Sequence, residues 1–263
     1  MNLALQTTRV IVFFPLLVWY LQGVVFCFTA SSNVRARLLV LDTLVPGQRL
    51  QLKGDTAPAS FQELCEASQD PLIVVGRQGL SLHSRGIQVF VEQDSSGGDT
   101  FTLSAATGRI AEICHGGEDE GSRWAGRQGT VKFLEFLDDD DLALSPNDRI
   151  PEEKKFAPDQ MASASESLRE LFLEWEQLVR NSGRERFPGH LDGIRRDLGE
   201  MPGTPNARAL WIAGFINPLP ALGVAMEIRP GVLTARSTER RLIMAEQGLR
   251  DSIARLQKPG PCF

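Results

Sequence analysis

The sequence predicts an α+β protein in which a small β-barrel precedes an α-helical bundle. Two periodicities support this prediction. From Arg37 to about Leu137, short runs of alternating apolar and polar residues are separated by Gly, Pro and Asp, as in half-buried strands. After an acidic stretch, apolar residues recur at helical spacing from Leu168 to Leu256. Six or seven short strands joined by tight turns favour a closed or nearly closed barrel.

The alternation is clearest in residues 86–93. Ile87, Val89 and Val91 fall on one face of the expected strand, and only Phe90 breaks the pattern. Such a strand is half-buried against a core. The expected strands, in chain order, are RLLVLD, QRLQLK, PLIVVG, GIQVFVEQ, TFTLSA, RIAEICH and TVKFLEFL.

One helix and one linker complete the first part of the chain. The helix is expected around Phe61, because Pro58 suits a first helical turn and Asp70 precedes a proline that favours extended backbone. The barrel is expected to end in the four carboxylates at 138–141. They lack the spacing of an EF-hand calcium loop, so a solvated acidic linker over residues 141–160 is favoured over a calcium site.

Three helices are expected in the second part, residues 161–258. A capping box of Ser163 and Glu166 begins the first helix, which Gly183 ends. Pro205 opens the second helix, ARALWIAGFI, whose apolar residues on every side predict a central position. Ser237 begins the third helix, which ends before the proline at 259.

Residues 216–230, INPLPALGVAMEIRP, combine three prolines with aliphatic side chains. Asn217 and Pro218 should end the central helix, and Arg229 with Pro230 should end a following short turn. The segment is therefore predicted to be a stiff corner between buried helices, with a binding site as the alternative. Because positions two apart do not face each other on a helix, Glu227 and Arg229 should have separate partners.

The amino terminus has the layout of a signal peptide. Met1–Leu41 contains no acidic residue, and Val10–Phe28 is nearly continuous apolar sequence. Cleavage is predicted between Cys27 and Phe28. A retained transmembrane anchor is the alternative, although a proline and polar residues interrupt the run.

The hydroxylated and basic segment 28–37 then resembles the second part of a bipartite plastid presequence, as found in algae with plastids of the secondary red lineage. This resemblance predicts delivery to a plastid, with no stable membrane anchor once the presequence is removed. Secretion or residence in the endoplasmic reticulum lumen is the alternative.

Composition and motifs argue against several functions. The 263 residues contain 28 Lys and Arg against 33 Asp and Glu, a net charge of −5, which does not favour nucleic acid as a partner. Without Cys27, the cysteines are odd in number and lack CxxC spacing, so neither a disulfide framework nor a zinc site is expected. There is no phosphate-binding loop. The only candidate residues for a hydrolase site are Ser81 and His83, and the sequence around Ser81 lacks the second glycine of a nucleophile elbow. No catalytic residue, metal or cofactor is therefore predicted.

Further motifs follow one another along the chain: LVLDTLVPGQRLQL, the expected Phe61 helix, LIVVG, RGIQVFVEQ, Gly108 with Arg109, GTVKFLEFLDDDD, Trp175, WIAGFI with Leu219 and Pro220, and Glu239 to Leu242. Their order resembles the amino-terminal domain of Lon proteases, over about residues 38–256. The resemblance implies a barrel like that of pseudouridine synthases and archaeosine transglycosylases (PUA-like) at residues 38–140, packed on helices. In Lon this domain recognises unfolded or tagged proteins. The ATPase and protease domains are not found before Phe263, so a non-catalytic module is expected.

The expected function is binding of unfolded or peptide-like protein segments, in protein quality control or as an adaptor. A groove between barrel and bundle, or an exposed strand edge, would take the peptide. Candidate groove residues are Ile216, Asn217, Leu219 and Met226. The alternatives are an assembly factor for one folded partner, or a small-molecule binder or hydrolase.

Overall fold

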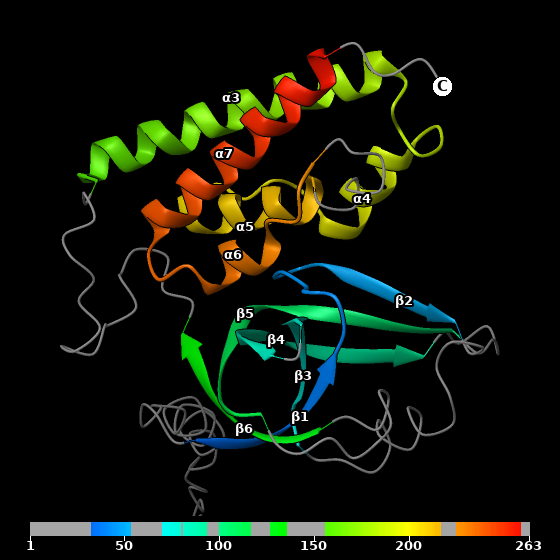
Figure 1. Ribbon diagram of the computed structural model, residues 1–263, viewed down its shortest axis with the longest axis vertical. Coiled ribbons are helices and arrows are strands. Elements are labelled where there is room, and N and C mark those ends of the chain that lie inside the picture. The colour runs from blue at the N-terminus through cyan, green and yellow to red at the C-terminus, as the bar shows by residue number, and fades with distance from the viewer. Residues whose placement is uncertain are drawn as a thin grey trace, which may run out of the picture. The chain divides into compact units, whose positions relative to one another are not determined.

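In the computed structural model of the chain, the residues whose structure is described are 33–53, 70–79, 81–93, 100–116, 127–135, 156–216 and 225–258. The chain divides into two units, Met1–Ser32 and Asn33–Phe263, and all of these residues belong to the second. Within them, strands come first and helices follow (Figure 1). The strands are β1 (Val34–Val40), β2 (Arg49–Lys53), β3 (Leu72–Gln78), β4 (Ser81–Gln93), β5 (Thr100–His115) and β6 (Arg127–Glu135). The helices are α3 (Pro158–Ser182), α4 (His190–Leu198), α5 (Pro205–Ile216), α6 (Arg229–Thr234) and α7 (Thr238–Gln257).

The sheet closes on itself, which confirms the predicted barrel. Its strand order is β2-β5-β4-β3-β1-β6, and β5 also pairs with β6. Five strands therefore form a ring, and β2 extends the sheet from β5. The β1–β3 pairing is parallel, whereas the other pairings are antiparallel. Closure removes most of the unpaired strand edge that an open sheet would expose.

Strand β5 is the element that makes closure possible. It contains two of the predicted strands, TFTLSA and RIAEICH, in one continuous run. Its first part pairs with β2 and its second part with β6, while β4 pairs along both. The β4–β5 register shifts between Ile87 and Val89. An irregularity of this kind bends the strands and increases their twist.

The apolar pattern explains which strand faces are buried. On β4, Ile87 and Val89 are buried, whereas Phe90 is 55% exposed, so the residue that breaks the alternation faces solvent. On β1, the neighbours Leu38 and Leu39 are both fully buried. Because successive strand side chains point to opposite faces, β1 is covered on both sides. Leu38 joins one apolar cluster with β3, β5 and β6, and Leu39 joins another that also contains residues of α5 and α6.

For the three long predicted helices, most boundaries are confirmed and one is wrong. Gly183 ends α3 in the left-handed region with φ 64°. Pro205 begins α5, and the Ser237 side chain accepts a hydrogen bond from Arg240 N (3.2 Å) to cap α7. However, α3 begins at Pro158 rather than at Ser163. The reason is a stronger start signal upstream, where proline occupies the first turn and the Gln160 side chain accepts from Ala157 N (3.0 Å).

The segment before α6 differs from the prediction in two ways. Arg229 and Pro230 begin helix α6 instead of ending a turn, because proline has no N–H and fits the first helical turn. Glu227 and Arg229 are also not separately paired. Arg229 Nε and Nη2 donate to the Glu227 carboxylate at 2.9 and 2.5 Å. Glu227 precedes the helix, so the helical spacing rule that predicted separate partners does not apply to it.

Several predictions fall outside the residues that the structure describes. These are the signal peptide with its cleavage site, the helix around Phe61, the carboxylates at 138–141 and the linker as far as residue 155. The transit-like segment lies outside up to residue 32, and β1 begins within it at Val34. Among the helices whose placement is described, none is both long enough and apolar enough to cross a membrane.

Candidate functional site

The junction between the barrel and the helices was predicted to hold the site. Its first component is the connection between β1 and β2. Pro46 and Gly47 make a tight turn in which Gln48 N donates to Val45 O (3.1 Å), and Gly47 has φ 79°. A positive φ at the third residue of such a turn favours glycine. The Gln48 side chain also accepts from Val45 N (3.2 Å), so Val45 is held from both directions.

Val45 packs directly on helix α5. A Cβ atom added at Gly214 would lie 2.6 Å from Val45 Cγ2, closer than such contacts can be. Val45 is itself fully buried. The contact joins barrel and helices in one apolar cluster, in which Val45 and strand residues such as Leu103 lie with Leu210, Ala213, Val232 and Leu233 of α5 and α6. In this part of the junction, buried apolar side chains fill the space between the barrel and the helices.

Two buried arginines form the second component of the junction. Arg85 of β4 donates from Nη1 to the carbonyl oxygens of Leu233 (3.3 Å) and Ala235 (2.8 Å). Arg241 of α7 donates from Nη2 to the same Ala235 oxygen (2.8 Å) and from Nε to Val232 O (3.1 Å). These carbonyls belong to the carboxyl end of α6, where the last turn of a helix leaves acceptors unsatisfied and carries partial negative charge.

Burial lowers the pKa of both arginines. Desolvation, and then the positive charge of Arg85, lower the pKa of Arg241 to about 10. The pKa of Arg85 is also lowered, chiefly by desolvation, while Glu112 acts in the opposite direction. Both side chains still carry their charge at neutral pH. They act as structural cations that tie β4 and α7 to the end of α6.

The structure describes two of the four predicted groove residues. Ile216 is fully buried in the helical cluster and presents no surface to a ligand. Met226 is 54% exposed. It lies between Ala225, which belongs to the helical cluster, and the segment around Ile228, which packs against both the helical and the barrel clusters. Asn217 and Leu219 lie outside the described residues.

Ser81 and His83, the possible hydrolase seed, lie on a β-hairpin. Ser81 pairs with Gln78 across a turn in which Gly79 has φ 60°. Ser81 thus opens a strand and is not at the strand-to-helix turn that exposes a nucleophile in an elbow. The His83 ring packs against Gly76, where an added Cβ would approach its Cδ2 to 2.6 Å. Within the described ranges, no group of three or more His, Cys, Asp and Glu side chains could hold a metal ion.

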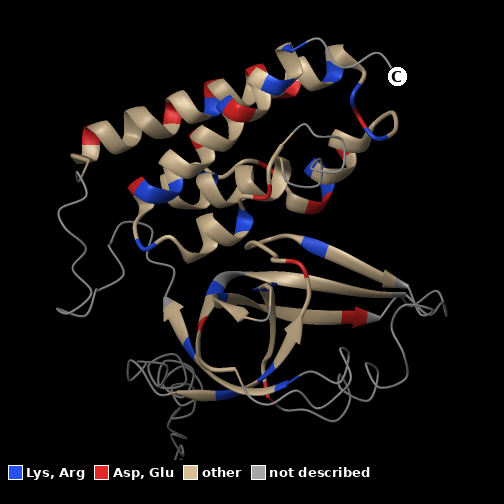
Figure 2. Ribbon diagram, viewed as in Figure 1, with Lys and Arg blue, Asp and Glu red and all other residues tan. Residues whose placement is uncertain are grey.

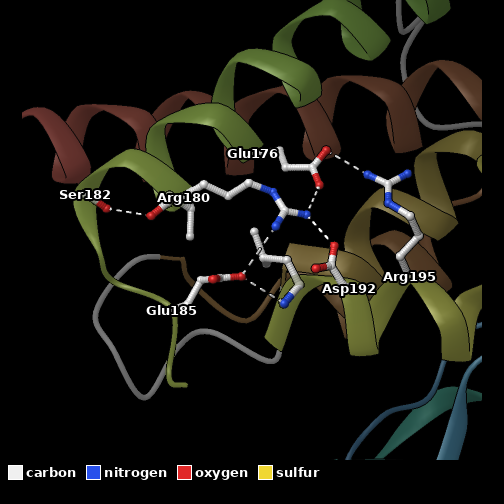
Figure 3. A network of polar contacts seen from close by, with 8 residues as sticks. Glu176, Arg180, Ser182, Glu185, Asp192 and Arg195 are labelled. Carbon is white, nitrogen blue, oxygen red and sulfur yellow. Dashed lines mark hydrogen bonds and ion pairs between the residues drawn. The ribbon is translucent and has the colours of Figure 1, made fainter. Parts of the chain in front are cut away.

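A polar network fixes the connection between α3 and α4 (Figure 3). Arg180 Nη2 donates to Glu176 (2.9 Å) and to Asp192 (2.7 Å), and Arg195 Nη2 donates to the other oxygen of Glu176 (2.7 Å). The bond from Arg180 lowers the pKa of Asp192. The Arg195 guanidinium also lies over the Phe215 ring, 5.4 Å from its centroid. The network therefore joins surface charges to the aromatic core of the helices.

Comparison with solved structures gives many matching chains, among them two Lon N-terminal domains. No protein-family model matches the chain, and no curated protein matches it significantly. One solved structure is the N-terminal domain of Mycobacterium avium complex Lon protease, with 18% identity and a TM-score of 0.49, covering 82% of this chain and 98% of that one. Another is a Lon N-terminal domain protein from Xanthomonas campestris, with 15% identity and a TM-score of 0.40, covering 80% and 95%. Both structures are named as Lon N-terminal domains.

Proposed function

We propose that this chain is a non-catalytic module that binds unfolded or peptide-like segments of other proteins. The observation that supports the proposal is the setting of Met226. Met226 is more than half exposed, while Ala225 before it lies in the helical cluster and Ile228 after it packs against both the helical and the barrel clusters. An unbranched, polarizable side chain adapts to many apolar partners, as recognition of varied unfolded segments requires.

The module is proposed to act in protein quality control or as an adaptor. Affinity capture from an extract of the plastid, the location proposed below, tests this role before and after mild heating of the extract. We expect many proteins in small amounts, with capture increasing after heating, because unfolding exposes apolar segments. An equally acidic unrelated bait is the control. One partner captured at a one-to-one ratio, unchanged by heating, would contradict this role and indicate an assembly factor.

We further propose that the chain is delivered to a plastid after cleavage between Cys27 and Phe28. Support comes from the acid-free amino terminus and from the basic segment that follows the apolar run. Fusing residues 1–40 to a fluorescent protein in a red-lineage alga tests this. Label within the plastid is expected, and label in the culture medium would show secretion instead. Mass spectrometry of the fusion would identify its new amino terminus.

A further inference from the structure

The turn between α3 and α4, residues 184–190, presents an exposed aromatic ring. Phe187 is 54% exposed. Its ring lies 4.7 Å from the imidazole of His190, centroid to centroid. The backbone closes over this pair, since His190 N donates to Phe187 O (3.1 Å). We refer to residues 184–190 as the Phe187 turn.

The Phe187 turn is held rigidly at both ends. Gly183 and Gly189 have φ of 64° and 79°, in the left-handed region where glycine is favoured. The Glu185 carboxylate accepts from Leu191 N (3.1 Å) at the start of α4. Arg180 and Asp192 join the two helices next to it (Figure 3). An aromatic side chain on such a preorganised turn loses little entropy when a partner covers it.

The charge that the Phe187 turn offers to solvent is positive, although the whole chain is acidic. Arg186, the residue before Phe187 in the chain, is exposed. The only carboxylate of the turn, Glu185, is directed inward to Leu191 N and toward Arg180. On the long faces of α3 and α7, in contrast, acidic and basic residues are interspersed (Figure 2). Aromatic and Arg side chains are also the residues most enriched at the energetic centres of protein interfaces.

These observations point to a specific docking surface. We propose that the Phe187 turn binds an acidic, extended protein segment that carries an apolar side chain. The apolar side chain packs on the Phe187 ring, and a carboxylate of the segment lies near Arg186. This inference rests on the proposed function, because it assigns part of that function to one surface.

The test uses two forms of one unfolded protein. A disulfide-rich globular protein is reduced and alkylated with iodoacetate, which adds a carboxylate at each cysteine, or with iodoacetamide, which adds a neutral group. The two probes share a sequence and differ in charge. Binding is measured by fluorescence anisotropy for the full chain and for Phe187→Ala and Arg186→Gln. Leu173→Ala and Arg250→Gln are the controls, since both residues are exposed but lie far along the chain from the turn.

We expect Phe187→Ala to weaken binding of the carboxylated probe by about tenfold, as for an aromatic hot spot. Arg186→Gln should weaken the carboxylated probe by about threefold and leave the neutral probe unchanged, since one exposed ion pair contributes little. The control variants should bind as the parent chain does.

Three results would overturn the inference, and they are distinguishable. Equal binding of both probes by the parent chain would remove the acidic preference. Tight binding that Phe187→Ala leaves unchanged would place the contact elsewhere, with the proposed function intact. Binding of neither probe would overturn the inference and the proposed function together. Circular dichroism of each variant checks that the helices are retained.

Discussion

Arg85 and Arg241 donate hydrogen bonds to one and the same oxygen atom, the Ala235 carbonyl, each at 2.8 Å. The two residues are far apart in the sequence, one in a barrel strand and one in the last helix. Their like charges repel, but the carboxyl end of α6 offers both of them partial negative charge. Through this atom the barrel, α6 and α7 are held as one unit.

A double-mutant cycle on these arginines tests their coupling. Arg85→Met and Arg241→Met should each lower the free energy of unfolding by about 1–3 kcal/mol, because buried acceptors lose donors. The double variant should lose more than the sum of the single losses, by about 1 kcal/mol. Either single substitution removes the repulsion between the two charges and leaves Ala235 O with one donor. The second substitution removes no further repulsion, but it leaves Ala235 O without either arginine donor.

The cycle is measured by urea unfolding, monitored by fluorescence and by circular dichroism. Arg250→Met is the control, because Arg250 is exposed on α7 and pairs only with nearby Glu246 among the contacts described. It should change the free energy of unfolding by less than about 0.5 kcal/mol. A double variant less destabilised than the sum would mean that the two arginines support each other, contrary to this account.

The contact between Gly214 and Val45 can be tested by adding a methyl group. Gly214→Ala should destabilise the protein by about 1–3 kcal/mol despite the better helix propensity of alanine, because Val45 is packed and cannot move away. Adding Val45→Ala to this variant should make room for the new methyl and recover part of the loss. Thermal unfolding of the four proteins measures both effects.

Gly193 provides the matched control for Gly214. It lies within α4, and a Cβ added there would meet nothing within 4 Å. Gly193→Ala should therefore raise the free energy of unfolding by about 0.8–1 kcal/mol through helix propensity alone. If both glycine variants stabilised the protein, the barrel would not be packed on α5 as described.

The pH dependence of stability should include a contribution from His190. Burial, and then the charge of Arg186, lower the pKa of His190, while Glu185 acts in the opposite direction. Its Nδ1 is buried without a hydrogen-bond partner, so a proton there gains no acceptor. The unfolded chain, with a pKa of about 6.5, then binds the proton more tightly. The contribution of neutral His190 to stability is therefore complete above about pH 6.5, the unfolded pKa. It is lost as the pH falls from there through the lower pKa of the folded protein.

The measurement is the melting temperature at pH 7.5 and pH 5 for the parent chain and for His190→Gln. The parent chain should lose more on acidification than the variant, because glutamine does not titrate. Carboxylates that titrate over the same range contribute equally to both proteins and cancel in the comparison. Equal losses would show that His190 makes no such contribution.

The sequence predicted the layers of the fold better than its junctions. The alternation around Ile87 and the apolar α5 helix identified the barrel and the central helix, because burial of one face leaves a periodic pattern. The Ser163 start failed because two start signals competed within five positions. The Glu227–Arg229 pair was missed because the segment was taken as helical. Strand pairing between β1 and β6 joins residues almost 100 positions apart, such as Val34 and Val131, so no local pattern specifies its register.

The residues of the buried arginine junction and of the Phe187 turn had even less sequence signal. Arg85 and Arg241 are charged, and charged residues are normally expected at the surface. Phe187 lies in a short loop without periodicity, so its exposure could not be inferred. Of the two predicted groove residues that the structure describes, Ile216 followed the apolar pattern into the core, and Met226 reaches solvent. A site made of single exposed side chains leaves no pattern that periodicity can detect.

We propose that this chain recognises proteins by their unfolded state. The most direct test compares its affinity for one purified protein in its native form and in its reduced, carboxymethylated form, by isothermal titration calorimetry. We predict binding of the unfolded form with a negative heat-capacity change, the mark of apolar burial, and no detectable binding of the native form. Equal affinity for both forms, or binding of the native form alone, would contradict the account.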